Sequence, residues 1–428
     1  MARESIAIVG AGIAGLATAW LLSRRYDVTL FEGNDYIGGH THTVDVQGSQ
    51  GQRGVDTGFM VFNHRNYPHL TALFDHLGIT SQPTDMSFSA SVGHGRLEYA
   101  GSDLDTLFAQ RRNLTNPRFL RMLADIIRFN RAGKRLLQAA PELDMTLGGY
   151  LLKEGYGPGF RDDYLLPMAA AIWSCPTHKM LDFPLRSFLN FFANHGLLDL
   201  RDRPQWHTVT GGSREYVKKI LQDLPDQVHA SRRVKAIQRR PDHIRVITDD
   251  GTETDFDQGV LACHADEILA MLDNPDKDEA RILGAFSYQP NRVILHTDTR
   301  LMPRLRKVWS SWNYMARHRL TDAPANEVSV TYWMNRLQAL DEPENYLVSL
   351  NPLEEPLPEK VIREMTYHHP VFDQEAMKAQ QVLPTIQGND RLWFCGAWTG
   401  YGFHEDGLRS ALEVAARLGV TPPWTGTV

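Results

Sequence analysis

The stretch SIAIVGAGIAGLATAWLLSRRYDVTLFE, residues 5–32, decides the fold of this chain. It opens with a β-branched run over residues 5–9, which is typical of a buried parallel strand. A helical pattern follows over residues 16–23, and a second strand pattern over residues 27–32. Strand, helix and strand in this order predict a βαβ unit, from which doubly wound α/β domains are built.

Three glycines with the spacing G-x-G-x-x-G join the first strand to the helix. We expect Gly10 to make the tight turn, Gly12 to let the backbone approach a pyrophosphate, and Gly15 to let helix and strand pack closely. The start of the helix, around Ala14, then offers unpaired N–H groups to the phosphates. Glu32 ends the second strand, where a carboxylate accepts the ribose hydroxyls and repels a 2′-phosphate. The unit therefore predicts a dinucleotide site and disfavours NADP.

Three further segments favour FAD over NAD. A Gly-Gly pair at 38–39 follows the second strand and gives a second point of close approach. GVDTGFMVF, residues 54–62, leads into an apolar strand. RLWFCGAWTGYGFHEDGLRSALEVAARLG, residues 391–419, predicts a strand, a glycine-rich loop and then a helix from about residue 407. A second helix N-terminus suits an isoalloxazine, whose N1–C2=O edge becomes negative on reduction.

The chain resembles the flavin amine oxidase superfamily, which includes monoamine and polyamine oxidases, protoporphyrinogen oxidase and the carotenoid desaturases. Within it, the sequence is most similar to bacterial FAD-binding oxidoreductases found beside cyclopropane-fatty-acid synthase homologues, and to the FAD domain of plant cyclopropane synthases. The resemblance covers the whole chain. The stretches that carry it are GGHTHT (38–43), LHTDTRLMP (295–303), WSSWNY (309–314), TYWMNRLQ (331–338), SLNP (349–352) and FCGAWTGYGFHEDG (394–407).

The resemblance implies which residues hold FAD beyond the opening unit. Val234 would contact the adenine through its backbone. The Gly-Gly pair would pass under the pyrophosphate and the ribityl chain, and the C-terminal loop would meet the pyrophosphate and the flavin. The implied residues are Gly38, Gly39, His40, Thr41, Val234, Gly396, Glu405, Asp406 and Gly407. Two positions depart from the family pattern, because His40 stands where Arg is common and Ala397 where Asp or Glu is common.

The chemistry of such a protein lies on the flavin, and the protein positions the substrate. Amine oxidases place a lysine near flavin N5, where this sequence has Arg292, which stays charged. They also flank the flavin with a tyrosine, where this sequence has Phe403. We expect His404 and Glu405 to be polar groups near the ring, with helix capping and loop bracing as the alternative. The expected catalytic site thus consists of Arg292, Phe403, His404 and Glu405.

These features predict an FAD-dependent oxidase or desaturase that takes a hydride from an apolar, fatty-acyl or lipid-like substrate. The alternative is a flavin-containing amine oxidase that acts on an amine or amino acid, and a third class is a flavin-bound protein without turnover. Aromatic residues either line an apolar tunnel or belong to the core. They are Trp173, Phe191, Phe192, Trp309, Trp312, Tyr314, Tyr332 and Trp333.

The order of the motifs predicts two interleaved domains in an α/β fold. A discontinuous Rossmann-like FAD-binding domain, of the glutathione-reductase or amine-oxidase type, is expected from residues 1–75, 205–285 and 388–428. An α+β substrate-binding cap domain is expected from residues 76–204 and 286–387, because helical and strand patterns alternate there.

Composition narrows the partners and the compartment. A net charge of −6 over 428 residues gives no pull toward nucleic acid. Cys175, Cys263 and Cys395 form no CxxC pair, so we expect no disulfide framework, no metal site and a cytoplasmic location. No apolar stretch reaches the length of a transmembrane helix. The apolar N-terminus superficially resembles a signal peptide, but glycines interrupt it and a strand follows directly.

A basic helix is expected around residues 117–138. Asn116 suits the N-cap and Pro117 the first helical position. Residues 111–135 carry eight Arg or Lys against one acid, Asp125. The favoured interpretation is a core-packed helix with a solvated basic face. The alternative is peripheral contact with an anionic membrane, at its inner face.

Overall fold

A parallel sheet is built around the first strand of the chain, as the βαβ pattern predicts. β1 (Ser5–Val9) lies between β2 (Asp27–Phe31) and β13 (Gln258–Leu261), and pairs with both in parallel. β9 (Val228–His229) and β19 (Leu392–Phe394) complete the order β19-β13-β1-β2-β9. Strands from distant parts of the sequence therefore meet at one carboxyl edge, where ligands bind in open α/β sheets.

The computed structural model describes residues 3–49, 51–139, 145–173, 180–199, 203–224, 226–317 and 328–426. Within these ranges, no helix is both long enough and apolar enough to span a bilayer.

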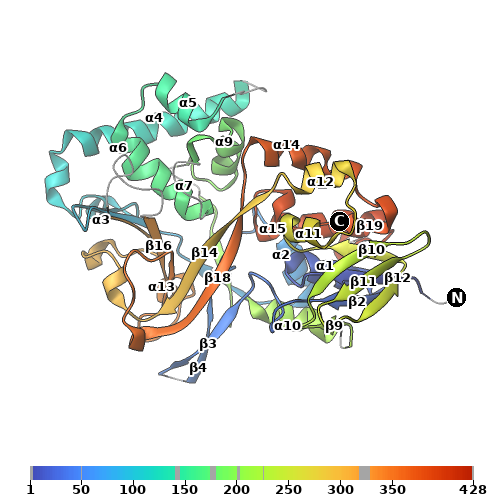
Figure 1. The fold of residues 1–428 in the computed structure, drawn as a ribbon. Helices are drawn as coiled ribbons and strands as arrows, with labels where there is room; N and C mark the ends of the chain where they lie inside the picture. The colour runs from blue at the N-terminus through green and yellow to red at the C-terminus, as the bar shows by residue number, and fades with distance from the viewer. Residues whose placement is uncertain are drawn as a thin grey trace.

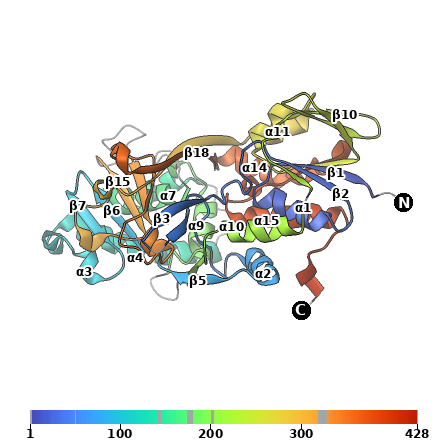
Figure 2. The ribbon, with the colours of Figure 1, turned by 90° about the horizontal axis from the view of Figure 1, so that it is seen from below.

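Helices cover one face of the parallel sheet and a β-meander covers the other (Figure 2). The helices of the first face are α1 (Ile13–Leu22), α2 (Pro68–Leu77), α10 (Arg214–Gln222) and α15 (His404–Arg417). The opposite face carries β10 (Val234–Arg239), β11 (Ile244–Thr248) and β12 (Glu253–Phe256), with α11 (Ala265–Met271), α12 (Lys277–Leu283) and α14 (Gln374–Val382). Every residue of α1 is buried, because the helix packs between the sheet and α15.

A second, mostly antiparallel sheet forms the core of the other lobe (Figure 1). Its order is β18 (Val361–Val371), β14 (Ser287–His296), β17 (Leu347–Leu350), β16 (Val328–Trp333), β15 (Trp312–Ala316), β6 (Phe88–Val92) and β7 (Leu97–Ala100). Only the β15–β6 pair is parallel. The long strands β14 and β18 run from this lobe toward the parallel sheet (Figure 1).

Helices form the rest of this lobe. They include α3 (Leu104–Leu107), α4 (Pro117–Ala139), α5 (Leu147–Lys153), α6 (Pro158–Phe160), α7 (Leu166–Trp173) and α9 (Leu185–Asn194). The helix predicted at 117–138 is present, and the Asn116 side chain accepts a hydrogen bond from Arg118 N (3.1 Å). α15, in contrast, starts at His404, three residues before the predicted start. The Asp406 carboxylate caps the turn there, because it accepts a hydrogen bond from Phe403 N (3.1 Å).

The α/β class is confirmed, and two elements link the expected FAD-binding and cap segments. The hairpin β3 (Thr43–Gly48)–β4 (Gly51–Asp56) places its valines in the hydrophobic core of the second sheet. β5 (Ser81–Thr84) pairs with β8 (Trp206–Val209) across the expected boundary at residues 204 and 205.

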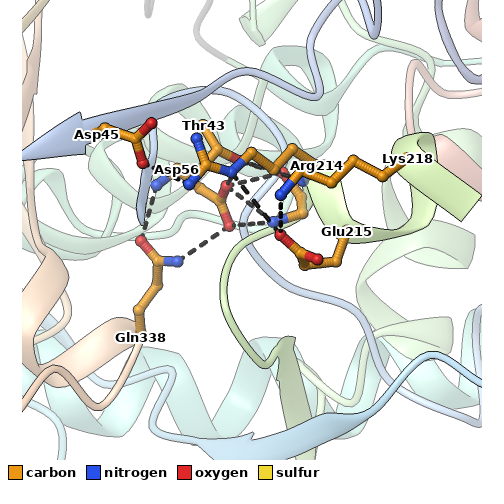
Figure 3. Close-up of polar contacts among 8 residues, drawn as sticks. Thr43, Asp45, Asp56, Arg214, Glu215, Lys218 and Gln338 are labelled. Atoms are coloured by element: carbon orange, nitrogen blue, oxygen red, sulfur yellow. Dashed lines mark hydrogen bonds and ion pairs between the residues drawn. The ribbon is translucent and has the colours of Figure 1, made fainter. Parts of the chain in front are cut away.

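A buried carboxylate ties these parts together at the end of β4. Asp56 is fully buried and accepts hydrogen bonds from Thr43 Oγ1 (2.5 Å), from Ser213 N (2.9 Å) and from Gln338 Nε2 (3.0 Å) (Figure 3). Asp56 N donates in return to Gln338 Oε1 (2.8 Å). Gln338 follows α13 (Met334–Leu337) in the second lobe, whereas Ser213 precedes α10 in the first. Burial raises the pKa of Asp56 to about 6, although the hydrogen bonds oppose the shift.

Replacing Asp56 should therefore loosen the contact between the lobes. We expect Asp56→Ala to lower the free energy of unfolding by about 3 kcal/mol, because buried donors of Ser213 and Gln338 lose their acceptor. Asp45→Ala is the matched control, since Asp45 forms only a half-exposed ion pair with Arg214, worth less than about 1 kcal/mol. Urea denaturation of both variants measures the difference. Equal losses would show that Asp56 does not join the lobes.

Candidate functional site

The turn between β1 and α1 closes only because residue 15 has no side chain. Gly10 N donates to Phe31 O (2.8 Å), which fixes the turn on β2. A Cβ at Gly15 would lie 1.8 Å from Gly10 O, so an alanine there would force α1 away from the strand. The N-terminus of α1 therefore stays at the carboxyl edge of the sheet. The N–H groups of its first turn, including that of Ala14, have no partner within the helix.

The face of Gly12 is open, as the approach of a phosphate requires. A Cβ at Gly12 would meet no atom within 4 Å. The Gly-Gly loop passes close by, because a Cβ at Gly39 would lie 3.0 Å from Gly12 Cα, and Gly38 N donates to Ala11 O (3.0 Å). The two glycine segments thus form one cradle over the start of α1. This arrangement fits the pyrophosphate of a dinucleotide.

Glu32 lies beside this cradle at the end of β2, where the adenosine ribose would bind. Its Oε2 accepts a hydrogen bond from Ala11 N (2.8 Å), and its Oε1 accepts two from Asn34. Each carboxylate oxygen can accept more than one hydrogen bond, so capacity for ribose hydroxyls remains. The backbone places Val234 nearby, because Arg232 N donates to Glu32 O (2.8 Å) two residues before β10 begins.

Four histidines gather next to the cradle, and we call them the histidine group: His40, His264, His368 and His369. The His40 ring centroid lies 5.3 Å from that of His369 and 6.4 Å from that of His264, and those of His264 and His368 are 6.3 Å apart. Burial and the neighbouring histidines hold the pKa of His40 well below its usual range, and burial lowers that of His369 to about 4. Across the described ranges, no three His, Cys, Asp or Glu side chains are placed to hold a metal ion.

One atom of this group points to a ligand. His40 Nε2 is buried and has no hydrogen-bond partner among the described residues. An orphaned buried nitrogen is costly unless a bound group satisfies it. It lies one residue after Gly39, where the diphosphate would pass. No local pattern predicts this group, because His264 precedes α11 whereas His368 and His369 belong to β18.

His404 is the first residue of α15, and its side chain contacts Thr41 and Phe59 from the N-terminal part of the chain and Tyr216 from α10. Its Nε2 lies 2.9 Å from Thr41 Oγ1 and 3.2 Å from Tyr216 OH, and its ring stacks on Phe59 at 3.7 Å. Thr41 and Tyr216 also hydrogen-bond to each other. Burial lowers the pKa of His404 to about 3, so the imidazole is neutral at pH 7. A neutral imidazole both donates and accepts a proton, which suits a polar group at a flavin edge.

Glu405 and Asp406 brace the backbone instead of facing an open site. Glu405 accepts hydrogen bonds from His69 N (2.9 Å) and Leu70 N (3.0 Å), which are N–H groups of the first turn of α2. Asp406 accepts from Tyr401 N (3.0 Å) in the loop before α15. The geometry thus agrees with the capping alternative for Glu405, and both carboxylates are committed to structure.

The glycines of the C-terminal motif bring α15 close to α1. Gly396 N donates to Ser410 Oγ (2.9 Å), which ties the end of β19 to the helix. A Cβ at Gly407 would lie 3.0 Å from Ile13 Cγ2, so the two helices approach each other here. Two helix N-termini therefore point toward the same edge of the sheet, as the sequence predicts.

Phe403 belongs to an aromatic cluster between α15 and α9. Its ring lies 5.1 Å from that of Phe191 and 5.5 Å from that of His195, and Phe191 also contacts Tyr401 (6.1 Å). Burial lowers the pKa of His195 to about 4, so it too is neutral at pH 7. The cluster therefore presents aromatic, uncharged surface beside His404.

Arg292 is not brought to this cluster. Its guanidinium is partly exposed and forms ion pairs with Glu355 and Glu364, both at 2.6 Å. Successive side chains of a strand point to opposite faces, so the neighbouring Asn291 points inward. Asn291 is fully buried and contacts His369 Nδ1 (2.9 Å). β14 therefore contributes Asn291 to the histidine group, and also Tyr288, whose ring stacks on that of His264 at 4.4 Å. The sequence analysis singled out neither residue.

Most of the aromatic residues expected in the cap lie in hydrophobic clusters. Phe191, Phe192 and Tyr314 are almost completely buried. Trp312 packs edge-on against Tyr332, and Trp309 against Trp333. The side chain of Trp173 and all of Cys175 lie outside the described residues.

The chain matches a family model described as flavin containing amine oxidoreductase, over residues 13–350. A Mycobacterium tuberculosis protein named "Putative flavin-containing monoamine oxidase AofH" is 26% identical over 260 residues, 58% of this chain and 54% of that protein. Polyamine oxidase 4 of Oryza sativa subsp. japonica is 24% identical over 317 residues, 70% of this chain and 60% of that protein. The matches thus span little more than half the length of these relatives.

Solved structures share the fold along the whole chain. A fatty acid isomerase from P. acnes that produces CLA superimposes with a TM-score of 0.69 at 17% identity, covering 97% of this chain and 99% of that one. A putrescine oxidase variant superimposes with a TM-score of 0.68 at 16% identity, with the same coverage of both chains. These likenesses show a common fold.

Alanine substitutions at Gly12 and Gly15 should distinguish an effect on cofactor binding from an effect on folding. We expect Gly12→Ala to fold normally and to bind FAD at least about tenfold more weakly, because its methyl group occupies the phosphate approach. Gly15→Ala should fail to fold or melt far below the parent, because its Cβ would lie 1.8 Å from Gly10 O. Thermal melting and the FAD content of the purified variants measure both effects. A Gly12→Ala protein with full FAD content would rule out the cradle.

Proposed function

We propose, on the premise that the chain belongs to the family of flavin-containing amine oxidoreductases, that it is an FAD-dependent oxidoreductase that oxidises an apolar, fatty-acyl or lipid-like substrate. The expected FAD cofactor agrees with the family and with the site. The residues that would hold it are Gly10, Gly12, Ala14, Gly15, Glu32, Gly38, Gly39, His40, Thr41, Val234, Gly396 and Gly407. When bound, FAD would supply the redox chemistry: the substrate would lose one hydride to the flavin and one proton to a base or water, and dioxygen or another two-electron acceptor would reoxidise the flavin.

The observation that carries the choice of substrate is that, among the described residues, the carboxylates next to Phe403 in the sequence are already engaged. The two nearest carboxylates in the sequence, Glu405 and Asp406, accept hydrogen bonds from backbone N–H groups. The two histidines that contact this region, His195 and His404, are held neutral by burial. A protonated amine gains most from a free carboxylate. Among the described residues around Phe403, an apolar carbon chain finds better complementarity.

The protein's own groups would orient the substrate and handle its proton. The rings of Phe403 and Phe191 would pack against a carbon chain and exclude water. His404, linked to Thr41 and Tyr216, would hold a proton at Nε2 and pass it along these hydroxyls. The histidine group would lie against the diphosphate. Arg292 has no role in this chemistry, because its side chain forms ion pairs with Glu355 and Glu364 at the surface.

An amine oxidase is the second candidate. The names of the mycobacterial and rice relatives favour it. The shared fold does not distinguish between the two candidate functions, since the fatty acid isomerase and the putrescine oxidase superimpose almost equally well on this chain. The aromatic cluster itself is compatible with an ammonium group through cation–π contact. The two candidates therefore differ in what they require near Phe403.

Anaerobic reduction of the bound flavin separates the candidates. We expect a lipid extract or free fatty acids to bleach the visible absorbance of the oxidised flavin, and putrescine and benzylamine to leave it unchanged. Phe403→Ala should slow the reduction at least about tenfold without loss of FAD, because the apolar wall is removed. Phe108→Ala is the matched control, in a different hydrophobic cluster.

Two other results would contradict the proposal. Bleaching by amines but not by lipids would favour the amine oxidase. Bleaching by neither would favour a flavin-bound protein without turnover.

A further inference from the structure

The exposed large apolar side chains among the described residues are concentrated in one segment of the chain. Most of the strongly exposed large ones lie between residues 104 and 152, in the helical part of the cap lobe. They are Leu104, Leu114, Leu120, Ile127 and Leu152, with exposed fractions from 39% to 85%; the other two are Leu305 and Ile362. Figure 1 shows α3, α4 and α5 at the outer edge of this lobe. Exposed apolar groups gathered in this way mark a binding surface.

α4 carries these apolar residues within a strongly basic outer face. Leu120 and Ile127 are seven residues apart, so they lie on one side of the helix. Arg121, Arg128 and Arg135 repeat at the same spacing beside them, and Arg131 and Lys134 are also exposed. The single acid of α4, Asp125, is buried, accepts a hydrogen bond from Gly157 N (2.9 Å), and pairs with Arg128 (3.0 Å) and Arg121 (3.8 Å). Lys134 pairs with Asp199, and the guanidinium groups remain at the surface. The outer face of α4 is therefore basic and apolar at once.

The end of α5 extends the same face. Arg128 Nη1 donates to Glu154 O and Arg121 Nη2 donates to Gly155 O, both at 3.3 Å. These bonds hold the segment after α5 against the arginines of α4. Leu152, the most exposed large apolar residue, precedes this segment by two residues. Apolar groups from two elements thus border one row of arginines.

We propose that this surface docks the protein on a membrane that contains anionic lipids. We call it the docking face: Leu114, Leu120, Ile127 and Leu152 with Arg121, Arg128, Arg131, Lys134 and Arg135. The leucines and Ile127 enter the level of the acyl chains, and the guanidinium groups contact lipid phosphates. Stable attachment of a peripheral protein requires both signals together, and the docking face supplies both.

The docking face does not depend on the identity of the substrate. It would bring the cap lobe to a store of lipid, which suits the proposed function, but membrane binding can be measured without turnover. The sequence analysis favoured a core-packed helix with a solvated basic face over contact with a membrane. α4 does pack on the core through Phe119, Met122 and Phe129, and this leaves its opposite face free for docking.

Co-sedimentation of the flavin-loaded, full-length protein with vesicles tests the proposal. We expect binding to vesicles of equal parts phosphatidylglycerol and phosphatidylcholine, and at least about tenfold weaker binding to phosphatidylcholine alone. Leu120→Glu with Ile127→Glu, and separately Arg131→Glu with Arg135→Glu, should each weaken binding by about tenfold or more. Ile362→Glu and Lys235→Glu change equally exposed residues elsewhere and should leave binding unchanged. Melting temperatures establish that all variants are folded.

Three results would overturn the docking face. The first is vesicle binding that neither double variant weakens. The second is a loss of vesicle binding in the two control variants as large as the loss in the double variants. The third is a loss of vesicle binding in the arginine double variant alone, while the parent protein binds polyglutamate as tightly as it binds the vesicles. That result would indicate an acidic protein partner. Flavin reduction by detergent-dispersed lipid should persist in both double variants. Loss of this reduction in the parent protein would contradict the proposed function, whereas a parent protein that reduces its flavin with dispersed lipid but does not bind the vesicles would refute docking alone.

Discussion

The contact between Gly15 and the carbonyl of Gly10 is the constraint on which the rest of the structure depends. Because no Cβ stands between them, α1 begins directly at the carboxyl edge of the parallel sheet. The Gly-Gly loop can then pass over Gly12, and α15 can approach α1 at Gly407. Glycine at three separated places in the chain thus brings two helix N-termini, a buried glutamate and the histidine group to one edge. This arrangement suits a dinucleotide with a terminal flavin, because its pyrophosphate would lie at the helix N-termini.

The second lobe is held in place by a polar contact that the hydrophobic cores do not provide. Asp56 receives donors from the start of α10 and from the end of α13, so one buried carboxylate connects both lobes close to the hairpin β3–β4. On the far side of the cradle, α15 carries Phe403 toward α9 in the cap. The aromatic cluster lies where these two lobes meet. Its uncharged character, with Glu405 and Asp406 hydrogen-bonded to backbone N–H groups, is the reason that we propose an apolar substrate.

The sequence predicted those features that are local in the chain. The βαβ unit, the glycine spacing and the basic helix follow from patterns within about 30 residues. The orientation of Arg292 does not follow from a local pattern, because a shift of one residue in the phase of a strand moves a side chain to the other face of the sheet. The histidine group and the partners of Glu405 depend on the pairing of β13, β14 and β18 and on the packing of α2, which no local pattern contains. Contacts across long sequence separations therefore account for most of what the sequence left open.

Titration of the protein freed of its cofactor tests the central claim most directly. In the proposed site the cradle would contact the adenosine and diphosphate half of FAD, and the start of α15 would face the flavin. FAD should therefore bind at one molecule per chain and quench its own fluorescence on binding. FMN, which lacks adenosine, should bind at least about a hundredfold more weakly, because the contacts at Gly12 and Glu32 are lost. Equal affinity for FMN and FAD, or no binding of FAD, would contradict the account.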